Sequence, residues 1–307
     1  MNRFMAFVAL LSAPGADREA LGNKARVLSE LCQDGFPVPP GFVIRTEAFD
    51  HFMASNGIHD AGSSIAEQLQ ALRGRILEGK MPLDLEDIIG RHFGALRHAC
   101  VAVRSSATLE DSDSRSFAGQ FDSFLGVTSD TLMAKIMECW ASLFKPRLPG
   151  GGVQGAEGGS MAVIVQAMVD ADASGVCFSV DPVTGDAGRI VIEAISGLGE
   201  LLVQGLVAPD QYTVEKGTFV IRHKRVLAQH QELRLKIPGG GLRMMLPDPC
   251  VPAQKVDDEA IRAIAELVLK VENKYRMAID IEWAFKGQTL FLLQARPVTA
   301  GIPASHE

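Results

Sequence analysis

Residues 278–297, AIDIEWAFKGQTLFLLQARP, form the stretch that decides the fold we expect for this chain. Two extended segments flank KGQ at 286–288, a polar break of the kind that closes a β-hairpin. Side chains alternate along a strand. The apolar residues of the first segment therefore point to one side, and Asp280 and Glu282 point to the other.

The second segment has its own apolar and polar sides. We expect Phe291, Leu293 and Ala295 to form the apolar set, with Gln294 and Arg296 on the opposite side. Any register that joins the two apolar sets also brings these polar residues beside the two carboxylates. This combination suits Mg²⁺ and a phosphate, because Mg²⁺ prefers oxygen ligands and arginine offers a planar fork. The alternative is an amphipathic hairpin with surface ion pairs.

The composition limits the class of protein. At 307 residues, with 47% hydrophobic and 22% charged residues, the chain fits one large soluble domain or two smaller lobes. A formal charge of −7 without a dense Lys/Arg stripe argues against a nucleic-acid partner. Five scattered cysteines without C-x-x-C spacing favour reduced thiols and a cytoplasmic protein. No apolar run approaches the ~20 residues of a membrane span, so no membrane partner is expected.

Residues 1–16, MNRFMAFVALLSAPGA, allow two interpretations. A basic residue, a short apolar run and small residues loosely resemble a secretory signal. The same run is also typical of an opening β-strand. We favour the strand, because a phosphate-transfer site has little use outside the cell.

Two segments in the first half also suggest phosphate binding. Lys24 follows a glycine at the start of an expected helix, where ammonium and backbone N–H groups can meet phosphate oxygens. A short apolar strand at 100–103 delivers RSSAT, residues 104–108, into a polar loop, so hydroxyls, N–H groups and a guanidinium gather there. A surface lysine and an ordinary charged loop are the plainer explanations of each segment taken singly.

The remaining segments indicate a scaffold of helices and strands. Residues 46–95 predict two or three amphipathic helices, and residues 257–275 predict a longer one. The glycine-rich stretch 149–160 is either a hinge or a plain connection. Strands are expected at 161–169, 175–180 and 189–194, and a hairpin at 211–222.

Several stretches together resemble one family. They are GNKARVLSEL, GFPVPPGFVI, VAVRSSATLEDSDSRSFAGQFDSFLGV, VIVQAMV, SGVCFSVDPVTGD, IVIEAISGLGELLVQG, PDQYTV and DIEWAFKGQTLFLLQARPVT. In this order, over residues 5–299, they resemble the N-terminal nucleotide-binding domain of the PEP synthase and pyruvate phosphate dikinase family, which includes rifampicin phosphotransferases. The resemblance implies an α+β ATP-grasp fold in one domain, 1–307, with approximate lobes 1–200 and 201–307 and a nucleotide cleft between them.

The resemblance also implies roles for individual residues. Lys24, Arg104 and Arg296 would contact phosphates and act in catalysis, and Asp280, Glu282 and Gln294 would hold Mg²⁺. The adenine would lie beside the strand that ends in VQAMV, and an acidic residue of IEA would approach the ribose. The implied ATP-binding set is Lys24, Arg104, Ser105, Ser106, Thr108, Gln166, Met168, Val169, Glu193, Asp280, Glu282, Gln294 and Arg296.

The chain departs from the family pattern in two places. Asn23 and Arg26 change the surroundings of Lys24, where the family usually has Gly-Gly-Lys-Gly/Asn-Ala. The glycine-rich stretch replaces a more structured segment that commonly carries an arginine, and Arg147 is the substitute that this chain offers.

Full-length family members pass phosphate from ATP to a histidine on a swivelling domain and then to an acceptor. None of the seven histidines lies in a Thr-Gly-Gly-x-x-x-His context. We therefore expect transfer of the β,γ-diphosphate to a histidine on a separate partner protein, with AMP as product. A nucleotide sensor that closes on ATP without transfer is the alternative. Direct phosphorylation of a small molecule is a third hypothesis, and it lacks a recognisable acceptor pocket.

Overall fold

The computed structural model describes residues 7–13, 20–59, 66–107, 122–145, 160–236, 239–246 and 253–298. The chain divides into two compact units. Unit 1 consists of Met1–Gly35, Pro40–Met168 and Ile237–Gly241. Unit 2 consists of Phe36–Pro39, Val169–Lys236 and Leu242–Glu307.

Unit 1 is built on a five-stranded antiparallel sheet with the strand order β1-β2-β5-β3-β4. Its strands are short and rich in β-branched residues, as expected for a sheet that is covered by helices. The strands are β1 (Val8–Leu10), β2 (Gly41–Ile44), β3 (Val101–Ala107), β4 (Ser123–Val127) and β5 (Met161–Ala167).

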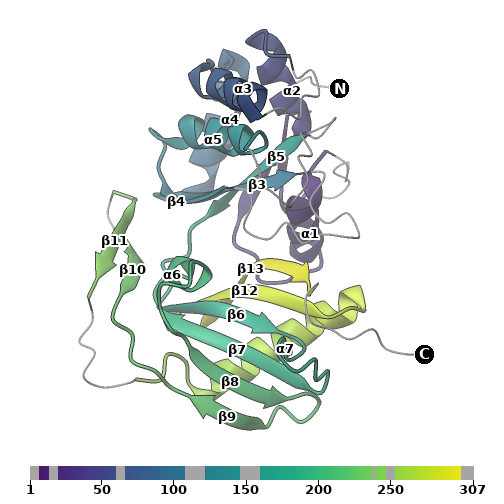
Figure 1. Cartoon of the computed structure of the whole chain (residues 1–307), viewed down its shortest axis with the longest axis vertical. Helices are drawn as coiled ribbons and strands as arrows, with labels where there is room; N and C mark the ends of the chain where they lie inside the picture. Colours follow the sequence, from purple (N-terminus) through teal and green to yellow (C-terminus); the bar gives the residue numbers. More distant parts are fainter. Residues whose placement is uncertain are drawn as a thin grey trace. The chain divides into compact units, whose positions relative to one another are not determined.

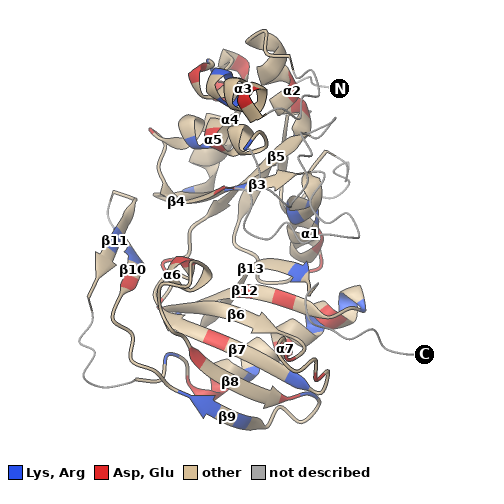
Figure 2. Cartoon of the chain, in the orientation of Figure 1, with Lys and Arg blue, Asp and Glu red and all other residues tan. Residues whose placement is uncertain are grey.

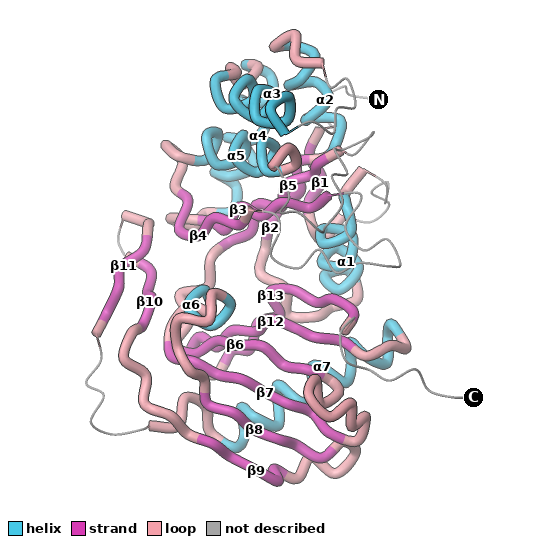
Figure 3. Tube along the Cα trace, viewed as in Figure 1, coloured by secondary structure: helices cyan, strands magenta, loops and turns pink. Residues whose placement is uncertain are grey.

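Helices cover both faces of this sheet (Figures 1 and 3). Four lie on one face: α2 (Thr46–Ser55), α3 (Ala66–Glu78), α4 (Leu83–Leu96) and α5 (Leu132–Ser142). The core there is centred on Trp140, whose ring centroid lies 5.8 Å from that of Phe49 and 5.0 Å from that of Phe52. Helix α1 (Gly22–Gln33) packs on the opposite face through Ala25, Leu28 and Leu31, which recur at helical spacing and are buried.

Unit 2 is built on a six-stranded antiparallel sheet with the order β13-β12-β6-β7-β8-β9. Its long helix α7 (Asp258–Tyr275) begins where the Asp257 side chain accepts a hydrogen bond from the Ala260 N–H, as an N-cap does. The predicted apolar stripe of α7 is buried. The strands are β6 (Ala173–Phe178), β7 (Arg189–Ser196), β8 (Asp210–Glu215), β9 (Ile221–Arg225), β12 (Ile279–Lys286) and β13 (Thr289–Pro297).

Unit 2 also contains the short helix α6 (Glu200–Val203) and a two-stranded sheet, β10 (Glu232–Leu235) with β11 (Leu242–Met245), which the sequence did not predict. Apart from Phe36–Pro39, unit 2 begins at Val169. Its strands β7 and β12, which lie on either side of residue 200 in the sequence, both pair with β6 in one hydrogen-bonded sheet. Among the described helices, none has both the length and the apolar character needed to cross a bilayer.

Candidate functional site

The β12–β13 hairpin brings together the four polar residues that the sequence singled out. Asp280 lies opposite Arg296, and Glu282 lies opposite Gln294. Directly opposite side chains of an antiparallel pair share one face of the sheet. The Arg296 Nε donates to both carboxylate oxygens of Asp280, at 2.9 and 2.7 Å. The predicted grouping on one face of the hairpin is therefore confirmed.

A β-bulge makes this grouping possible. The turn sets Lys286 opposite Thr289. Uninterrupted pairing from there would place Gln294 opposite Ile281, on the apolar face. The register instead shifts by one residue, with Leu293 as the extra residue of β13. The shift turns Gln294 and the arginine that follows it to the polar face.

The same bulge overturns part of the expected apolar set. Leu292 is fully buried opposite Trp283, and Ala295 is buried as predicted. Phe291 and Leu293 are only half-buried. Strict alternation was the wrong assumption for β13, because the extra residue moves the buried position from Leu293 to Leu292.

A row of four residues, three of them polar, continues across the sheet from the hairpin. Glu282, Val176, Glu193 and Gln211 lie opposite one another on successive strands, β12, β6, β7 and β8. Glu193 therefore shares a face with Glu282, and Figure 2 shows acidic residues on both β12 and β7. The Gln211 Nε2 donates to the Glu193 Oε1 at 2.9 Å. Sequence reasoning missed Gln211. The alternation of PDQYTV could have placed its side chain on the face of the strand that does not carry the buried tyrosine.

The opposite face of this sheet packs on α7 and holds another carboxylate. Asp210 is fully buried and accepts hydrogen bonds from the Leu227 N–H at 2.9 Å and the Lys255 N–H at 2.9 Å. The Lys255 Nζ lies 3.1 Å from it and the Tyr212 hydroxyl donates to it at 2.8 Å. These four donors satisfy the buried charge within the protein.

Asp280 lies in a different electrostatic setting. Burial raises the pKa of its carboxyl from 3.8 to about 6, although Arg296 opposes the rise, and the neighbouring Glu282 carboxylate adds to it. A cation beside this pair would favour its ionised form. The described residues contain no group of three or more His, Cys, Asp or Glu side chains that could hold a metal by themselves. Two carboxylates and the Gln294 amide still fit Mg²⁺, which usually keeps waters and phosphate oxygens as further ligands.

In unit 1, three predicted residues lie on the face of the sheet that α1 covers. Arg104 on β3 lies opposite Ile164 on β5, and Gln166 lies two residues further along β5, so both point to the same side. Lys24 lies in the first turn of α1. The fold thus brings an ammonium-bearing helix start over the strand that carries the predicted arginine.

The two serines that follow Arg104 have hydroxyls engaged in the fold. The Ser105 Oγ donates to the Asp122 carbonyl at 2.9 Å. The Ser106 Oγ donates to the Leu21 carbonyl at 2.9 Å and accepts from the Ala25 N–H at 3.0 Å. Their contact with ATP stays a prediction. Thr108, the loop at 109–120, the glycine-rich stretch and Arg147 lie outside the described residues.

The two predicted adenine-side residues Met168 and Val169 lie where the chain leaves unit 1. The Met168 N–H donates to the Cys100 carbonyl at 3.3 Å. The Val169 carbonyl accepts from the Ala171 N–H at 2.8 Å, which forms a tight turn at the first residues of unit 2. Contact of either residue with a base stays a prediction.

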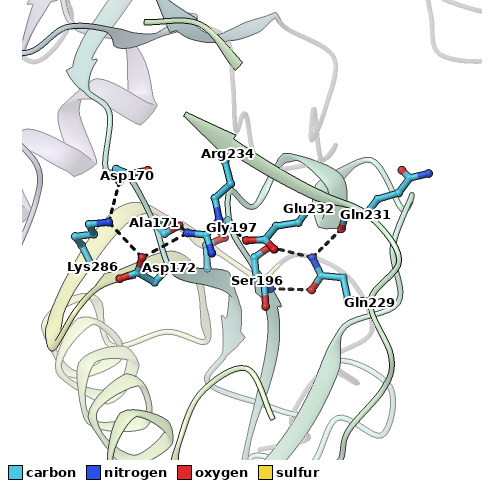
Figure 4. Close-up of polar contacts among 11 residues, drawn as sticks. Asp170, Ala171, Asp172, Ser196, Gly197, Gln229, Gln231, Glu232, Arg234 and Lys286 are labelled. Atoms are coloured by element: carbon cyan, nitrogen blue, oxygen red, sulfur yellow. Dashed lines mark hydrogen bonds and ion pairs between the residues drawn. The ribbon is translucent and has the colours of Figure 1, made fainter. Parts of the chain in front are cut away.

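A polar cluster fixes those first residues of unit 2 (Figure 4). The Lys286 Nζ lies 2.8 Å from the Asp170 carboxylate and 3.2 Å from that of Asp172. The Arg234 guanidinium donates to the Ala171 carbonyl at 2.7 Å. Lys286 comes from the β12–β13 turn and Arg234 from β10, so side chains distant in sequence hold this segment from both sides. Sequence reasoning missed them, because their partners are defined only by the fold.

Comparison with known proteins identifies the family of this chain. Residues 18–306 match the family model described as "Pyruvate phosphate dikinase, AMP/ATP-binding domain". A match over nearly the whole chain shows that this protein belongs to that family of ATP-binding domains.

Three curated relatives illustrate the match. "Probable phosphoenolpyruvate synthase" of Methanocaldococcus jannaschii is 34% identical, over 97% of this chain and 27% of that protein. The protein of the same name from Methanothermobacter thermautotrophicus is 33% identical, over 100% of this chain and 48% of its own length. "Prodigiosin synthesizing transferase PigC" of Serratia marcescens is 36% identical, over 91% of this chain and 31% of its own. The chain thus spans less than half the length of these relatives.

Among solved structures, D-alanyl-alanine synthetase A from Vibrio cholerae is similar to this chain with a TM-score of 0.34 and 11% identity. The similarity covers 88% of this chain and 54% of that one. A score at this level supports no conclusion about fold or function.

Proposed function

We propose that this chain binds Mg-ATP and transfers the β,γ-diphosphate to a histidine on a separate protein, with AMP as product. The observation that carries the proposal is the β12–β13 register, which gathers two carboxylates, an amide and a guanidinium on one face. Membership of an AMP/ATP-binding family supports the choice of ligand. The ATP-grasp fold is part of the proposal.

The metal would be held by Glu282, Gln294 and Asp280. All three offer oxygen ligands, and the pKa of Asp280 is raised mainly by burial, with the Glu282 carboxylate adding to the rise. When bound, Mg²⁺ would neutralise the negative charge of the phosphate oxygens. The proton on Asp280 would then compete with the metal at pH values below about 6.

The protein's own cations would bind and orient the phosphates. Arg296 has a 44% exposed side chain, so its guanidinium, whose Nε donates to Asp280, would be accessible to a phosphate. Lys24 and Arg104 of unit 1 would add positive charge at the phosphates. Phosphoryl transfer depends mainly on positioning and charge neutralisation, so these groups suffice without a nucleophile in this chain.

The base and the sugar would be bound by groups that carry less charge. Gln166, Met168 and Val169 would border the adenine. Glu193, oriented by Gln211, would accept a hydrogen bond from a ribose hydroxyl. A cytoplasmic setting, where ATP is available, agrees with the four described cysteines being free thiols.

Product analysis tests the proposal. The chain is incubated with Mg-ATP labelled at the β-phosphate, with and without a separately produced swivelling histidine domain, and the nucleotides are separated by chromatography. We expect AMP and acid-labile label on the histidine domain. ADP as product would contradict diphosphate transfer. Recovery of intact ATP with the histidine domain present, despite binding, would leave the chain as a nucleotide sensor.

A further inference from the structure

The start of helix α1 is joined to strand β3 by one buried hydroxyl. The Ser106 side chain has no exposed surface. Its Oγ donates to the Leu21 carbonyl at 2.9 Å and accepts from the Ala25 N–H at 3.0 Å. In a regular α-helix the N–H of residue i bonds to the carbonyl of residue i−4, so these two backbone groups are the pair that closes the first turn. The hydroxyl of a distant strand bridges them.

A side chain that bonds to both groups of such a pair ties the first turn of the helix to the strand that carries it. Lys24 is the residue immediately before Ala25, within the turn that Ser106 bridges. The position of the backbone that carries Lys24 is therefore tied to β3 by this side chain.

The contact is close on the backbone side as well. Gly22, the first residue of α1, has φ +67°, a conformation that favours glycine. A Cβ at this position would lie 2.2 Å from the Ser106 carbonyl oxygen and 2.6 Å from its Oγ. No side chain fits there, so the helix start and the strand touch through main chain and one hydroxyl.

Strand β3 also carries Arg104, two residues before Ser106 and on the same face, roughly 7 Å away along the strand. We infer that Ser106 is a positioning residue: its hydroxyl fixes the Lys24 turn against the strand that bears Arg104, so that both cations meet one set of phosphates. This inference rests on the proposed function, because it assigns Lys24 and Arg104 to the phosphates of ATP. The inference concerns how the phosphates of ATP are bound, and it predicts no change in the binding of the adenine base.

Substitution Ser106→Ala tests the inference through ligand selectivity. Without the hydroxyl, the first turn of α1 loses its two hydrogen bonds to β3, so Lys24 is no longer held in place against that strand. Misplacement of a group by ~1 Å can lower a reaction rate ~100-fold where geometry matters. We expect Ser106→Ala to weaken Mg-ATP binding ~10-fold or more in calorimetry and to leave adenosine binding unchanged. Equal weakening for both ligands would show a merely structural role and overturn the inference.

Two variants keep the test decisive. Ser142→Ala is the matched control, because its Oγ is also buried and bonded within unit 1, to the Cys139 carbonyl at 2.6 Å, away from the proposed site. It should leave the ratio of ATP to adenosine affinity unchanged. Ser106→Cys retains a weak donor and acceptor. It should give an intermediate ratio, and it also serves if the alanine variant does not fold.

Comparison with Lys24→Ala separates the inference from the function it rests on. If Lys24→Ala leaves ATP affinity unchanged, the proposed phosphate site is wrong. If Lys24→Ala weakens ATP binding and Ser106→Ala does not, the positioning role is wrong and the proposed function stands. If Ser106 acts through Lys24, the double variant binds ATP no more weakly than Lys24→Ala alone. Additive losses in the double variant would contradict the inference.

Discussion

Carboxylates on the two faces of the six-stranded sheet in unit 2 lie in different surroundings. Asp210, on the face that packs against α7, is fully buried and is met by Lys255, a tyrosine hydroxyl and two backbone N–H groups. Asp280, on the opposite face, has its two oxygens held by the Nε of Arg296, and burial raises its pKa to about 6.

The difference separates a structural charge from a charge that is available for binding. A carboxylate with a buried lysine and several neutral donors has its charge compensated and few lone pairs to offer. A carboxylate whose pKa is raised lies in surroundings that compensate its charge incompletely, which is common at functional sites. The same residue type therefore serves stability on one face and, in our proposal, ligand binding on the other.

Replacement of Asp210 by asparagine should have the largest effect on stability. Asp210→Asn leaves the Lys255 ammonium, whose side chain is 6% exposed, as a buried charge without its counter-charge. Breaking a buried pair in this way costs ~3–5 kcal/mol. Urea denaturation at pH 7 measures the loss. A change below ~1 kcal/mol would mean that Asp210 is not the structural charge that the hydrogen bonds indicate.

The equivalent change on the other face should act on turnover. Glu282→Gln removes a charge from the proposed metal site, and we expect AMP formation to fall ~100-fold or more, the size seen when one electrostatic group is removed. The free energy of unfolding should stay within ~0.5 kcal/mol of the original value. Glu215→Gln is the matched control, since Glu215 is a carboxylate of β8 paired with Arg222 at the surface. Equal turnover by the Glu282 and Glu215 variants would remove Glu282 from the site.

The raised pKa of Asp280 predicts a pH-dependent difference in stability, of intermediate size, between the original chain and Asp280→Asn. Its folded pKa, about 6, exceeds the unfolded value of 3.8, so the folded state binds the proton more tightly. The carboxyl therefore adds stability below about pH 4 that is lost as the pH rises through 6, in all ~2–3 kcal/mol. Asp280→Asn, which stays neutral, should match the original chain near pH 4 and be more stable above pH 7. Thermal unfolding between pH 4 and 8 measures this; a difference that does not change with pH would contradict the assigned environment.

The exposed ion pairs beside the site should contribute least. Lys286 is 48% exposed and pairs with Asp170 and Asp172, and the hydrogen bond to Asp170 is the main reason that its pKa is raised. Such surface pairs are worth ~1 kcal/mol or less and are screened by salt. Lys286→Ala should lower stability by less than ~1 kcal/mol in dilute buffer, with the difference disappearing in concentrated salt. A larger, salt-independent loss would show that the cluster in Figure 4 has a structural role like that of Asp210.

Local patterns in the sequence predicted much of this arrangement. Alternation and a polar turn predicted the hairpin and placed Asp280 with Arg296, and helical spacing predicted the buried stripe of α7. The extra residue Leu293 was missed, because a bulge is defined by the pairing with the partner strand. The composition of the bulged strand alone does not reveal it.

Contacts between distant residues escaped prediction for a related reason. The hydroxyl of Ser106 meets backbone groups 81 and 85 residues away, and Gln211 reaches Glu193 only once β7 and β8 are in register. A serine or a glutamine taken singly indicates neither partner. The residue types of the candidate site were readable, whereas the groups that orient them depend on how the strands pair.

The most direct test of the central claim is a calorimetric titration of the chain with ATP, with and without Mg²⁺, repeated for Glu282→Gln. If the polar face of β12–β13 holds the metal and the phosphates, binding by the original chain strengthens at least ~10-fold with Mg²⁺, and the variant loses this gain. ATP binding of equal affinity with and without Mg²⁺, or the same gain in both proteins, would contradict the assignment of this face as the metal and phosphate site.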